Sequence, residues 1–363
     1  MNIVTLIMVF FSILGAVDYI LDNRFGIGRE WERGFHLLGS MSLTMIGMIV
    51  LAPCIEHALA PVLSIIAEKT AFEPSIIAGS LLANDMGGAT LSLALAQNDR
   101  IGYFNGLVVA SMMGCTLSFT LPFALGVVDK KQHRLLLIGL LCGIVTIPIG
   151  CIVAGLLLGI SLVTLTFDLI PLILLAAILV FGLLKSPEKC VRIFNALGIA
   201  VKIIITIGLV VGMITFLTGY EVIPYAAPIE EGALVILNAA LVLSGTFPLV
   251  SMVSRLLRKP LQTFGNKIGI NSTSAMGLVA SLASSATSFG LMKHMDDRGT
   301  VLNSAFAVSG AFVFGSHLAY TLSVQGDYLL SVVVGKLVAG ICAVIVAYVT
   351  YPKLNKKENE KAT

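Results

Sequence analysis

Residues 75–97 read SIIAGSLLANDMGGATLSLALAQ, an apolar run that is interrupted at its centre by Asn84-Asp85-Met86-Gly87-Gly88. The interruption leaves two arms of about ten residues, and at 1.5 Å per residue each arm reaches about 15 Å, the midplane of a bilayer. We therefore predict that this run enters the membrane and returns on the same side as a re-entrant hairpin. A single tilted helix with a glycine kink is the alternative.

The rest of the chain is equally apolar. Of its 363 residues, 57% are hydrophobic and only 12% are charged, and the mean hydropathy is +0.98, well above the values of soluble domains. At about 20 apolar residues per helical crossing, this length allows roughly nine to twelve membrane segments and no sizeable soluble domain. Because the long apolar runs lack the alternation of outer-membrane strands, they predict an all-α polytopic membrane protein.

Eleven apolar segments are predicted, with short loops between them. They fall at about 3–21, 37–55, 75–97, 104–128, 135–158, 162–184, 195–218, 233–253, 274–293, 300–322 and 328–350. Amphipathic stretches at 56–74 and 254–272 precede the third and ninth segments. The first segment lacks a basic leader and a cleavage site, so we expect a retained helix rather than a signal peptide. Residues 1–352 are thus predicted to form a single transmembrane domain, and 353–363 a polar C-terminal tail.

The chain aligns with itself at a constant offset of 198 residues, the spacing from Asp99 to Asp297. Without a gap, this offset matches Gly79, Leu93, Asp99, Arg100, Asn105, Ser111 and Ser118 with Gly277, Leu291, Asp297, Arg298, Asn303, Ser309 and Ser316. Polar matches at one spacing are hard to obtain by chance in an apolar sequence, so they predict an internal duplication. Repeat one covers about 1–158, a linking helix about 162–184, and repeat two about 190–350.

The charges of the loops predict how the two repeats are oriented, because basic loops stay on the cytoplasmic side. Three loops are basic and one is acidic: 129–134, 185–192 and 255–267 against the loop that carries Glu221, Glu230 and Glu231. The loop near Arg29 and the lysine-rich C-terminus also become cytoplasmic only if 75–97 and 274–293 both return on the side where they enter. We therefore predict about nine crossings plus two re-entrant or broken-helix hairpins, arranged as an inverted repeat in the bacterial inner membrane.

Asp85 carries the strongest functional signal, since a carboxylate in the middle of an apolar segment costs several kcal/mol unless it is paired or functional. Gly87 and Gly88 let the backbone open there, so that half-helix ends can meet a solute. A buried carboxylate selects cations, which admits a small organic ammonium, Na⁺ or H⁺. The alternative is a structural ion pair with Lys202 or Lys336, of which Lys336 is the deeper and better candidate.

Other polar residues inside apolar segments complete the predicted substrate-binding set. With Asp85, Gly87 and Gly88 it comprises Asn84, Asn105, Ser111, Ser284, Ser285, Asn303, Ser309 and His317. Asparagine and serine at these depths are equally consistent with hydrogen bonds between helices, and His317 with a proton-linked group or a satisfied core histidine. Structural or gating roles are predicted for Asp99, Arg100, Asp297, Arg298, Pro148 and Lys336.

The sequence carries no enzyme motif such as Gly-x-Ser-x-Gly or His-Glu-x-x-His. Its six cysteines are scattered without metal-ligand spacing. We therefore expect no catalytic residues, no metal and no cofactor. The basic residues lie in loops rather than in one patch, so we expect the lipid bilayer and a small solute as partners and no nucleic acid. Assembly into a homo-oligomer is left open.

Several stretches resemble the ethanolamine transporters of bacterial ethanolamine-utilisation operons, the EutH family. In chain order they are AGSLLANDMGG (78–88), SMMG (111–114), GIVTIPIGCI (143–152), MDDRG (295–299) with NSAFAVS (303–309), and VGKL (334–337). The resemblance implies uptake of ethanolamine as a carbon and nitrogen source for a cytoplasmic ammonia-lyase. Two positions depart from the family pattern: 284–287 stand where the family resembles Asn-Asn-x-Pro, and Ser316 stands where an Asp is common before the histidine.

Ethanolammonium requires a carboxylate, an aromatic face and a few hydrogen-bond partners. Asp85 supplies the charge in this prediction, and Tyr103 and Tyr320 are the nearest aromatic candidates. One alternative is a secondary transporter of another small polar solute, such as a nucleoside or an amino acid. The other is a membrane sensor or scaffold without transport, against which the lack of a soluble output domain argues.

Overall fold

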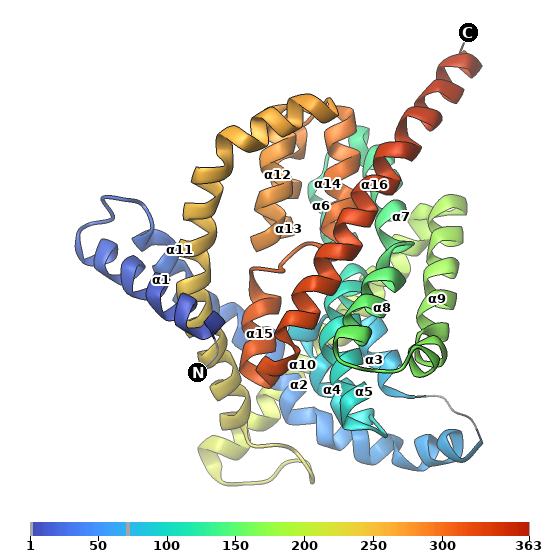
Figure 1. Cartoon of the computed structure of the whole chain (residues 1–363). Coiled ribbons are helices and arrows are strands. Elements are labelled where there is room, and N and C mark those ends of the chain that lie inside the picture. The colour runs from blue at the N-terminus through green and yellow to red at the C-terminus, as the bar shows by residue number, and fades with distance from the viewer. Residues whose placement is uncertain (1–2, 70–72, 363) are drawn as a thin grey trace.

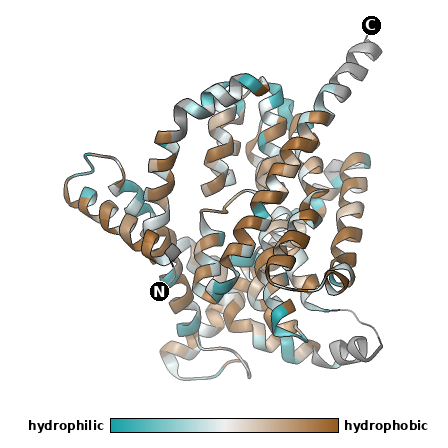
Figure 2. Cartoon of the chain, viewed as in Figure 1, coloured by the Kyte–Doolittle hydropathy of each residue, from teal (hydrophilic) through white to brown (hydrophobic). Residues whose placement is uncertain are grey.

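The fold of the chain rests on a computed structural model that describes residues 3–69 and 73–362. The regular elements in these ranges are all helices, which confirms the all-α prediction. Among them, seven helical stretches are long and apolar enough to cross a bilayer. Figure 2 shows apolar residues along the helices throughout the body of the molecule. The chain is thus a multi-pass membrane protein, and the predicted number of crossings stays a prediction.

Four helices that include the three longest of the first 268 residues pack against one another. They are α1 (Ile3–Ile20), α2 (Gly28–Lys69), α10 (Pro187–Thr218) and α11 (Ile229–Ile268). A Cβ atom at Gly47 would overlap the backbone carbonyl of Ile205, so α2 and α10 approach each other this closely only because residue 47 is glycine. Most of the predicted amphipathic stretches 56–74 and 254–272 belongs to these helices, since α2 continues to Lys69 and α11 to Ile268, and residues 70–72 lie outside the described part of the chain. We call α2 and α11 the framework helices.

Residues 75–95 form the first helical hairpin, from α3 (Ser75–Leu81) through the short turn η1 (Asn84–Met86) to α4 (Gly88–Leu95). Its two ends lie next to each other, because the Glu73 carboxylate accepts hydrogen bonds from the backbone N–H groups of Ser75 (3.5 Å) and Gln97 (3.0 Å). Gly87 closes the turn with a φ of 93°, which non-glycine residues rarely adopt. The chain therefore leaves this hairpin beside the point where it entered.

Residues 272–291 form a second hairpin, made of α12 (Ser272–Ala283) and α13 (Ser285–Leu291) and followed by the turn η5 (Met292–His294). The Asp296 carboxylate accepts hydrogen bonds from the Asn271 N–H (2.8 Å) and the Ser274 hydroxyl (2.7 Å), so the ends of this hairpin are also adjacent. In Figure 1 the second hairpin occupies the upper part of the molecule, and the first hairpin lies lower. The two hairpins thus reach toward the middle from opposite ends.

The remaining helices complete the bundle around the two hairpins. They are α5 (Asp99–Tyr103) with the π-helical turns η2 (Phe104–Gly114) and η3 (Thr116–Thr120) and α6 (Leu121–Val127); η4 (Lys130–Gln132), α7 (His133–Ile144) and α8 (Ile147–Leu157); α9 (Leu162–Lys185); α14 (Asp297–Ser309), α15 (Ser316–Gln325), η6 (Gly326–Tyr328) and α16 (Leu329–Ala362). The helix α16 includes most of the predicted tail. The side chains of its tail lysines, Lys353, Lys356, Lys357 and Lys361, lie outside the described part of the chain.

Two segments that the sequence predicted as continuous are broken. The predicted segment 300–322 is interrupted between α14 and α15, where Phe312 has a φ of 60°. The backbone N–H groups of Phe312 and Phe314 donate to the carbonyls of Ser281 (3.0 Å) and Leu282 (2.8 Å) in the second hairpin, which satisfies the open backbone. The predicted segment 135–158 breaks between α7 and α8, directly before Pro148, as expected for a proline near a helix start.

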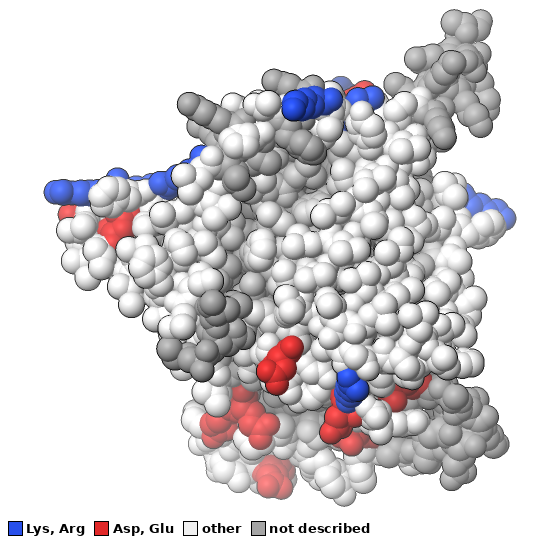
Figure 3. Space-filling view, in the orientation of Figure 1, with Lys and Arg blue, Asp and Glu red and all other residues white. Residues whose placement is uncertain are grey.

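Charge separates the two ends of the molecule. On the face that Figure 3 shows, most Lys and Arg lie toward the end where α11 terminates, and most Asp and Glu lie at the opposite end. The C-terminus lies at the basic end (Figure 1). Because basic loops stay in the cytoplasm, this end is the one that we expect to face the cytoplasm.

Candidate functional site

A cavity of about 400 Å³ lies where the tips of both hairpins meet the framework helices and the start of α15. Hairpin one contributes Ala83, Asp85 and Met86, and hairpin two contributes Ala283 and Ser284. The wall is completed by Arg33, Leu37, Ser40, Met41, Thr44 and Met45 of α2, Phe247 of α11, Cys115, Phe119, Phe312, Ser316 and His317. Three of the predicted binding residues, Asp85, Ser284 and His317, therefore come together although they are far apart in sequence.

The carboxylate of Asp85 and the imidazole of His317 face each other in this cavity. The Asp85 side chain is 17% exposed and that of His317 only 2%, and the distance from Asp85 Oδ1 to His317 Nε2 is 3.8 Å. This distance exceeds that of a direct hydrogen bond. The His317 ring lies against the Phe312 ring (centroids 5.0 Å apart), which in turn contacts Phe119 edge to face (5.6 Å). A carboxylate beside aromatic walls is the arrangement that suits a small organic cation.

Positions separated by 198 residues meet at this cavity. Asp85 and Ala283 both line it, as do Phe119 and His317. The chemistry of the paired positions differs, because only one tip carries a carboxylate and only one of the aromatic positions is an imidazole. The cavity therefore has a polar pair, Asp85 and His317, contributed by different halves of the chain.

Lys336 on α16 is fully buried, and its ammonium group donates a hydrogen bond to the backbone carbonyl of Ser111 (2.6 Å). Among the described residues no N···O distance of 4.0 Å or less joins Lys336 to Asp85, and the ring nitrogen within that distance of Asp85 is Nε2 of His317. Lys336 still interacts with Asp85 electrostatically. It therefore lies behind the cavity and is not a direct partner of the carboxylate.

The two predicted asparagines attach the hairpins to the helices behind them. The side-chain amide of Asn303 donates to the Ser274 carbonyl (2.9 Å) and its oxygen accepts from the Ser288 hydroxyl (3.0 Å), so it bonds to both arms of hairpin two. The amide of Asn105 donates to the Ser75 hydroxyl (2.9 Å) of hairpin one and to Asp168 (3.1 Å) of α9. Neither asparagine lines the cavity.

The other predicted binding residues lie around the tips without lining the cavity. Asn84, Ser285 and Ser309 are buried, and their side chains have no hydrogen-bond partner among the described residues. The hydroxyl of Ser111 bonds to Val108 within its own helix. At Gly88 a Cβ atom would overlap the carbonyl of Leu82, so glycine is required for the tight return of the hairpin.

The predicted structural arginines bind backbone carbonyls at helix ends. Arg100 donates to the carbonyl of Leu158 at the end of α8, and Arg298 donates to Ile268 at the end of α11 (3.0 Å). Their neighbours Asp99 and Asp297 are exposed. The helix caps are instead one residue earlier, at Asn98 and Asp296. Asn or Asp directly before a helix is a recognised capping signal that could have found both.

The aromatic walls were not predicted from the sequence. Tyr103 packs against Tyr328, and the Tyr320 hydroxyl bonds to Thr90 (3.3 Å), and neither of the two predicted tyrosines lines the cavity. Phe119, Phe247 and Phe312 line it instead. Phenylalanine is ordinary in apolar segments, and the one available signal was the repeat, which pairs Phe119 with His317.

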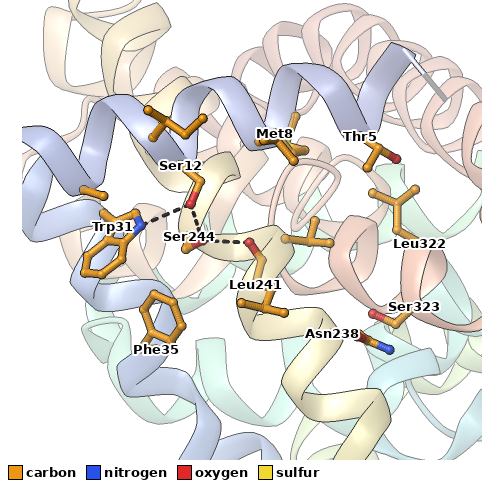
Figure 4. A pocket seen from close by; sticks show the side chains of 14 residues that line it. Thr5, Met8, Ser12, Trp31, Phe35, Asn238, Leu241, Ser244, Leu322 and Ser323 are labelled. Carbon is orange, nitrogen blue, oxygen red and sulfur yellow. Dashed lines mark hydrogen bonds between the residues drawn. The ribbon is translucent and has the colours of Figure 1, made fainter. Parts of the chain in front are cut away.

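A second cavity, of about 620 Å³, lies between α1, the first turns of α2, α11 and α15 (Figure 4). Within it the Trp31 indole donates to the Ser12 hydroxyl (3.1 Å), which shares a hydrogen bond with Ser244 (2.9 Å). The residues that line this cavity include no Asp, Glu, Lys, Arg or His. It offers a cation no charged partner, so the smaller cavity at Asp85 is the better candidate for the functional site.

Residues 1–350 match the family described as "Ethanolamine utilisation protein, EutH". The chain is 44% identical to a protein of Listeria monocytogenes named probable ethanolamine permease EutH, over 99% of this chain and 96% of that one. Proteins of the same name from Salmonella typhimurium and Escherichia coli are each 38% identical, over 97% of this chain and 96% of theirs. No solved structure matches the chain. Since the family match extends over nearly the whole sequence, the chain belongs to the EutH family of ethanolamine utilisation proteins.

Proposed function

We propose that this protein is an ethanolamine permease of the bacterial inner membrane and that it binds ethanolammonium in the cavity at Asp85. The observation that supports this most directly is the Asp85 carboxylate, which faces an aromatic-walled cavity between the tips of two hairpins. Relatives of nearly equal length named probable ethanolamine permease support the choice of substrate.

The chemistry of the substrate matches the chemistry of the cavity. The amine of ethanolamine is an alkylamine like that of lysine, so it is protonated at neutral pH. The ammonium group can donate hydrogen bonds to Asp85, and the faces of Phe119 and Phe312 provide cation–π attraction. The ammonium form does not cross lipid unaided, so a carrier is required for it.

The size of the substrate limits how tightly it can bind. Because ethanolamine has four non-hydrogen atoms, a ceiling of about 1.5 kcal/mol per atom limits its binding free energy to about 6 kcal/mol, a Kd of roughly tens of micromolar. The cavity of about 400 Å³ is larger than this ligand, so ordered water can share it. We therefore expect an affinity in the micromolar range or weaker.

The position of the cavity fits alternating access. It lies between two hairpins that reach in from opposite ends and two framework helices that line its other wall. In carriers built this way, relative movement of such parts opens a fixed site to one side and then to the other. We infer that the hairpins move against α2 and α11 during transport.

Uptake of radiolabelled ethanolamine into proteoliposomes tests the proposed function. At pH 6 nearly all ethanolamine is charged, so protein-free liposomes measure the small background from diffusion. We expect saturable uptake that unlabelled ethanolamine inhibits and that glucose does not. Uptake equal to that of protein-free liposomes would contradict the proposal, and parallel runs with Na⁺ or H⁺ gradients show which ion, if any, is coupled.

A further inference from the structure

The cavity at Asp85 presents a second polar group at a distance that one small molecule can bridge. His317 Nε2 lies 3.8 Å from Asp85 Oδ1, too far for a good direct hydrogen bond, for which about 2.7–3.2 Å is normal. A molecule with an ammonium at one end and a hydroxyl two carbons away can contact both atoms at once. The two side chains are therefore spaced as partners for the two ends of one ligand.

The surroundings of His317 determine which of its nitrogens carries the proton. Nδ1 is buried and has no hydrogen-bond partner among the described residues. A proton on Nδ1 would leave a buried N–H unsatisfied, which is rarer and more costly than an unpaired acceptor. The neutral imidazole therefore carries its proton on Nε2, facing Asp85. The Phe312 ring, with its centroid 5.0 Å away, holds the imidazole in this orientation.

We propose that His317 recognises the hydroxyl group of the substrate while Asp85 binds its ammonium group, an inference that rests on the proposed function. The Nε2–H group of His317 donates to the hydroxyl oxygen, and the ammonium donates to the Asp85 carboxylate. The bound substrate then completes the contact that the two side chains do not make directly. The ligand class selected in this way is a short 2-amino alcohol. A simple alkylammonium can still bind Asp85, but it has no hydroxyl group to accept the hydrogen bond from His317.

The other hydroxyl-bearing side chains of the cavity leave His317 as the best-placed partner. Ser40 and Thr44 use their hydroxyls on backbone carbonyls of α2. Ser316 interacts with Asp85 itself. Ser284 remains as the rival for the substrate hydroxyl. The position 198 residues before His317 is Phe119, which lines the same cavity without a polar atom.

Competition between ethanolamine and n-propylamine for the purified protein tests the inference. n-Propylamine replaces the hydroxyl with a methyl group of similar size and keeps the ammonium. At pH 7 we expect the wild-type protein to bind ethanolamine about tenfold to a hundredfold more tightly than n-propylamine. His317→Phe, which installs the residue of the paired position, should bring this ratio close to one with little change for n-propylamine. His317→Gln keeps an N–H donor and should retain part of the ratio.

Matched controls separate recognition from folding. Tyr320→Phe removes a hydroxyl from the same helix that bonds to Thr90 outside the cavity, and it should leave the ratio unchanged. Each variant must elute from a size-exclusion column at the same volume as the wild-type protein. If His317→Phe does not fold, His317→Gln takes its place in the comparison.

Three outcomes would overturn the inference. Equal binding of both amines by the wild-type protein would show that the hydroxyl is not recognised, while saturable ethanolamine uptake would leave the proposed function standing. Equal weakening of both amines by His317→Phe would show that His317 acts on Asp85 or on the fold. Loss of the ratio in Ser284→Ala but not in His317→Phe would assign the hydroxyl to Ser284. If the wild-type protein neither binds nor transports ethanolamine, the proposed function itself fails.

Discussion

At the scale of single residues, a carboxylate, an imidazole and a lysine ammonium group lie behind and around one cavity. Asp85 faces the cavity, His317 lies 3.8 Å from it, and Lys336 is bonded to the Ser111 carbonyl further back. Buried charges are costly unless each has a partner. Asp85 faces the cavity, so a cationic ligand bound there can supply the opposite charge that a carboxylate in the membrane interior requires.

Asp85→Asn removes the charge from hairpin one while keeping the shape of the side chain. We expect the affinity for ethanolamine to fall by about a hundredfold or more, because the ammonium loses its buried counter-charge. Binding to the purified protein measures the change. Asp327→Asn, at an exposed position before α16, is the control and should bind as the wild type does. Wild-type affinity in well-folded Asp85→Asn would exclude this residue from the site.

Lys336→Met tests whether the buried lysine stabilises the fold by balancing Asp85. The substitution leaves Asp85 without a nearby positive charge and the Ser111 carbonyl without its donor, so we expect a stability loss of roughly 1–3 kcal/mol. The double variant Asp85→Asn/Lys336→Met should regain part of this loss. Thermal unfolding of the three variants in detergent gives the comparison. Additive effects of the two substitutions would mean that the charges act independently.

At the scale of elements, the tip of hairpin one depends on a backbone conformation that only glycine adopts easily. Gly87→Ala places a Cβ at a φ of 93° and against the Met48 side chain, which we expect to cost about 1–3 kcal/mol and lower the Tm by several °C. Gly126→Ala is the control, since a Cβ there meets no atom within 4 Å. Equal Tm values for the two variants would show that the tip relaxes without cost.

The sequence predicted hairpin one better than the break in the 300–322 segment, and the reason is physical. Asn84, Asp85, Gly87 and Gly88 are polar or flexible residues in an apolar run, so the local pattern contains the interruption. The break before α15 lies in the apolar run 311–314, and carbonyls of Ser281 and Leu282 stabilise it from another element. A contact between distant segments leaves no local pattern, and only the flanking Gly310 and Gly315 hint at it.

The difference between local sequence signals and contacts between distant segments also explains which residues of the site could be predicted from the sequence. Asp85 and His317 stood out because ionisable groups are rare inside apolar segments. The cavity walls Phe119, Phe247 and Phe312 did not, because their apolar side chains match their surroundings. Asn105 and Asn303 were recognised as polar and buried, but only the structure shows that they bond the hairpins.

At the scale of the whole molecule, the separation of charge predicts how the protein sits in the membrane. We expect the loop near Arg29 and the C-terminus both to face the cytoplasm, which requires both hairpins to be re-entrant. Single cysteines placed at each position in a variant without native cysteines, and labelled from outside intact cells with an impermeant reagent, test this. Labelling of the C-terminus from outside would favour eleven full crossings.

Growth of bacteria on limiting ethanolamine tests the need for a carrier of the charged form. Neutral ethanolamine crosses lipid unaided, so we expect deletion of the gene to impair growth strongly at pH 6 and only slightly at pH 8. A strain that carries the gene on a plasmid is the control. Equal impairment at both pH values would mean that the requirement does not follow the ammonium form.

Transport of a cation through the cavity at Asp85, between the basic and acidic ends of the molecule (Figure 3), would respond to the membrane voltage. A carrier that moves ethanolammonium alone moves one positive charge per cycle, so the inside-negative voltage of a living cell draws the substrate inward. Each 100 mV contributes about 2.3 kcal/mol, enough for a roughly fiftyfold accumulation. A cell with an energised membrane could therefore concentrate a scarce nutrient without ATP, and would lose that ability when its voltage collapsed.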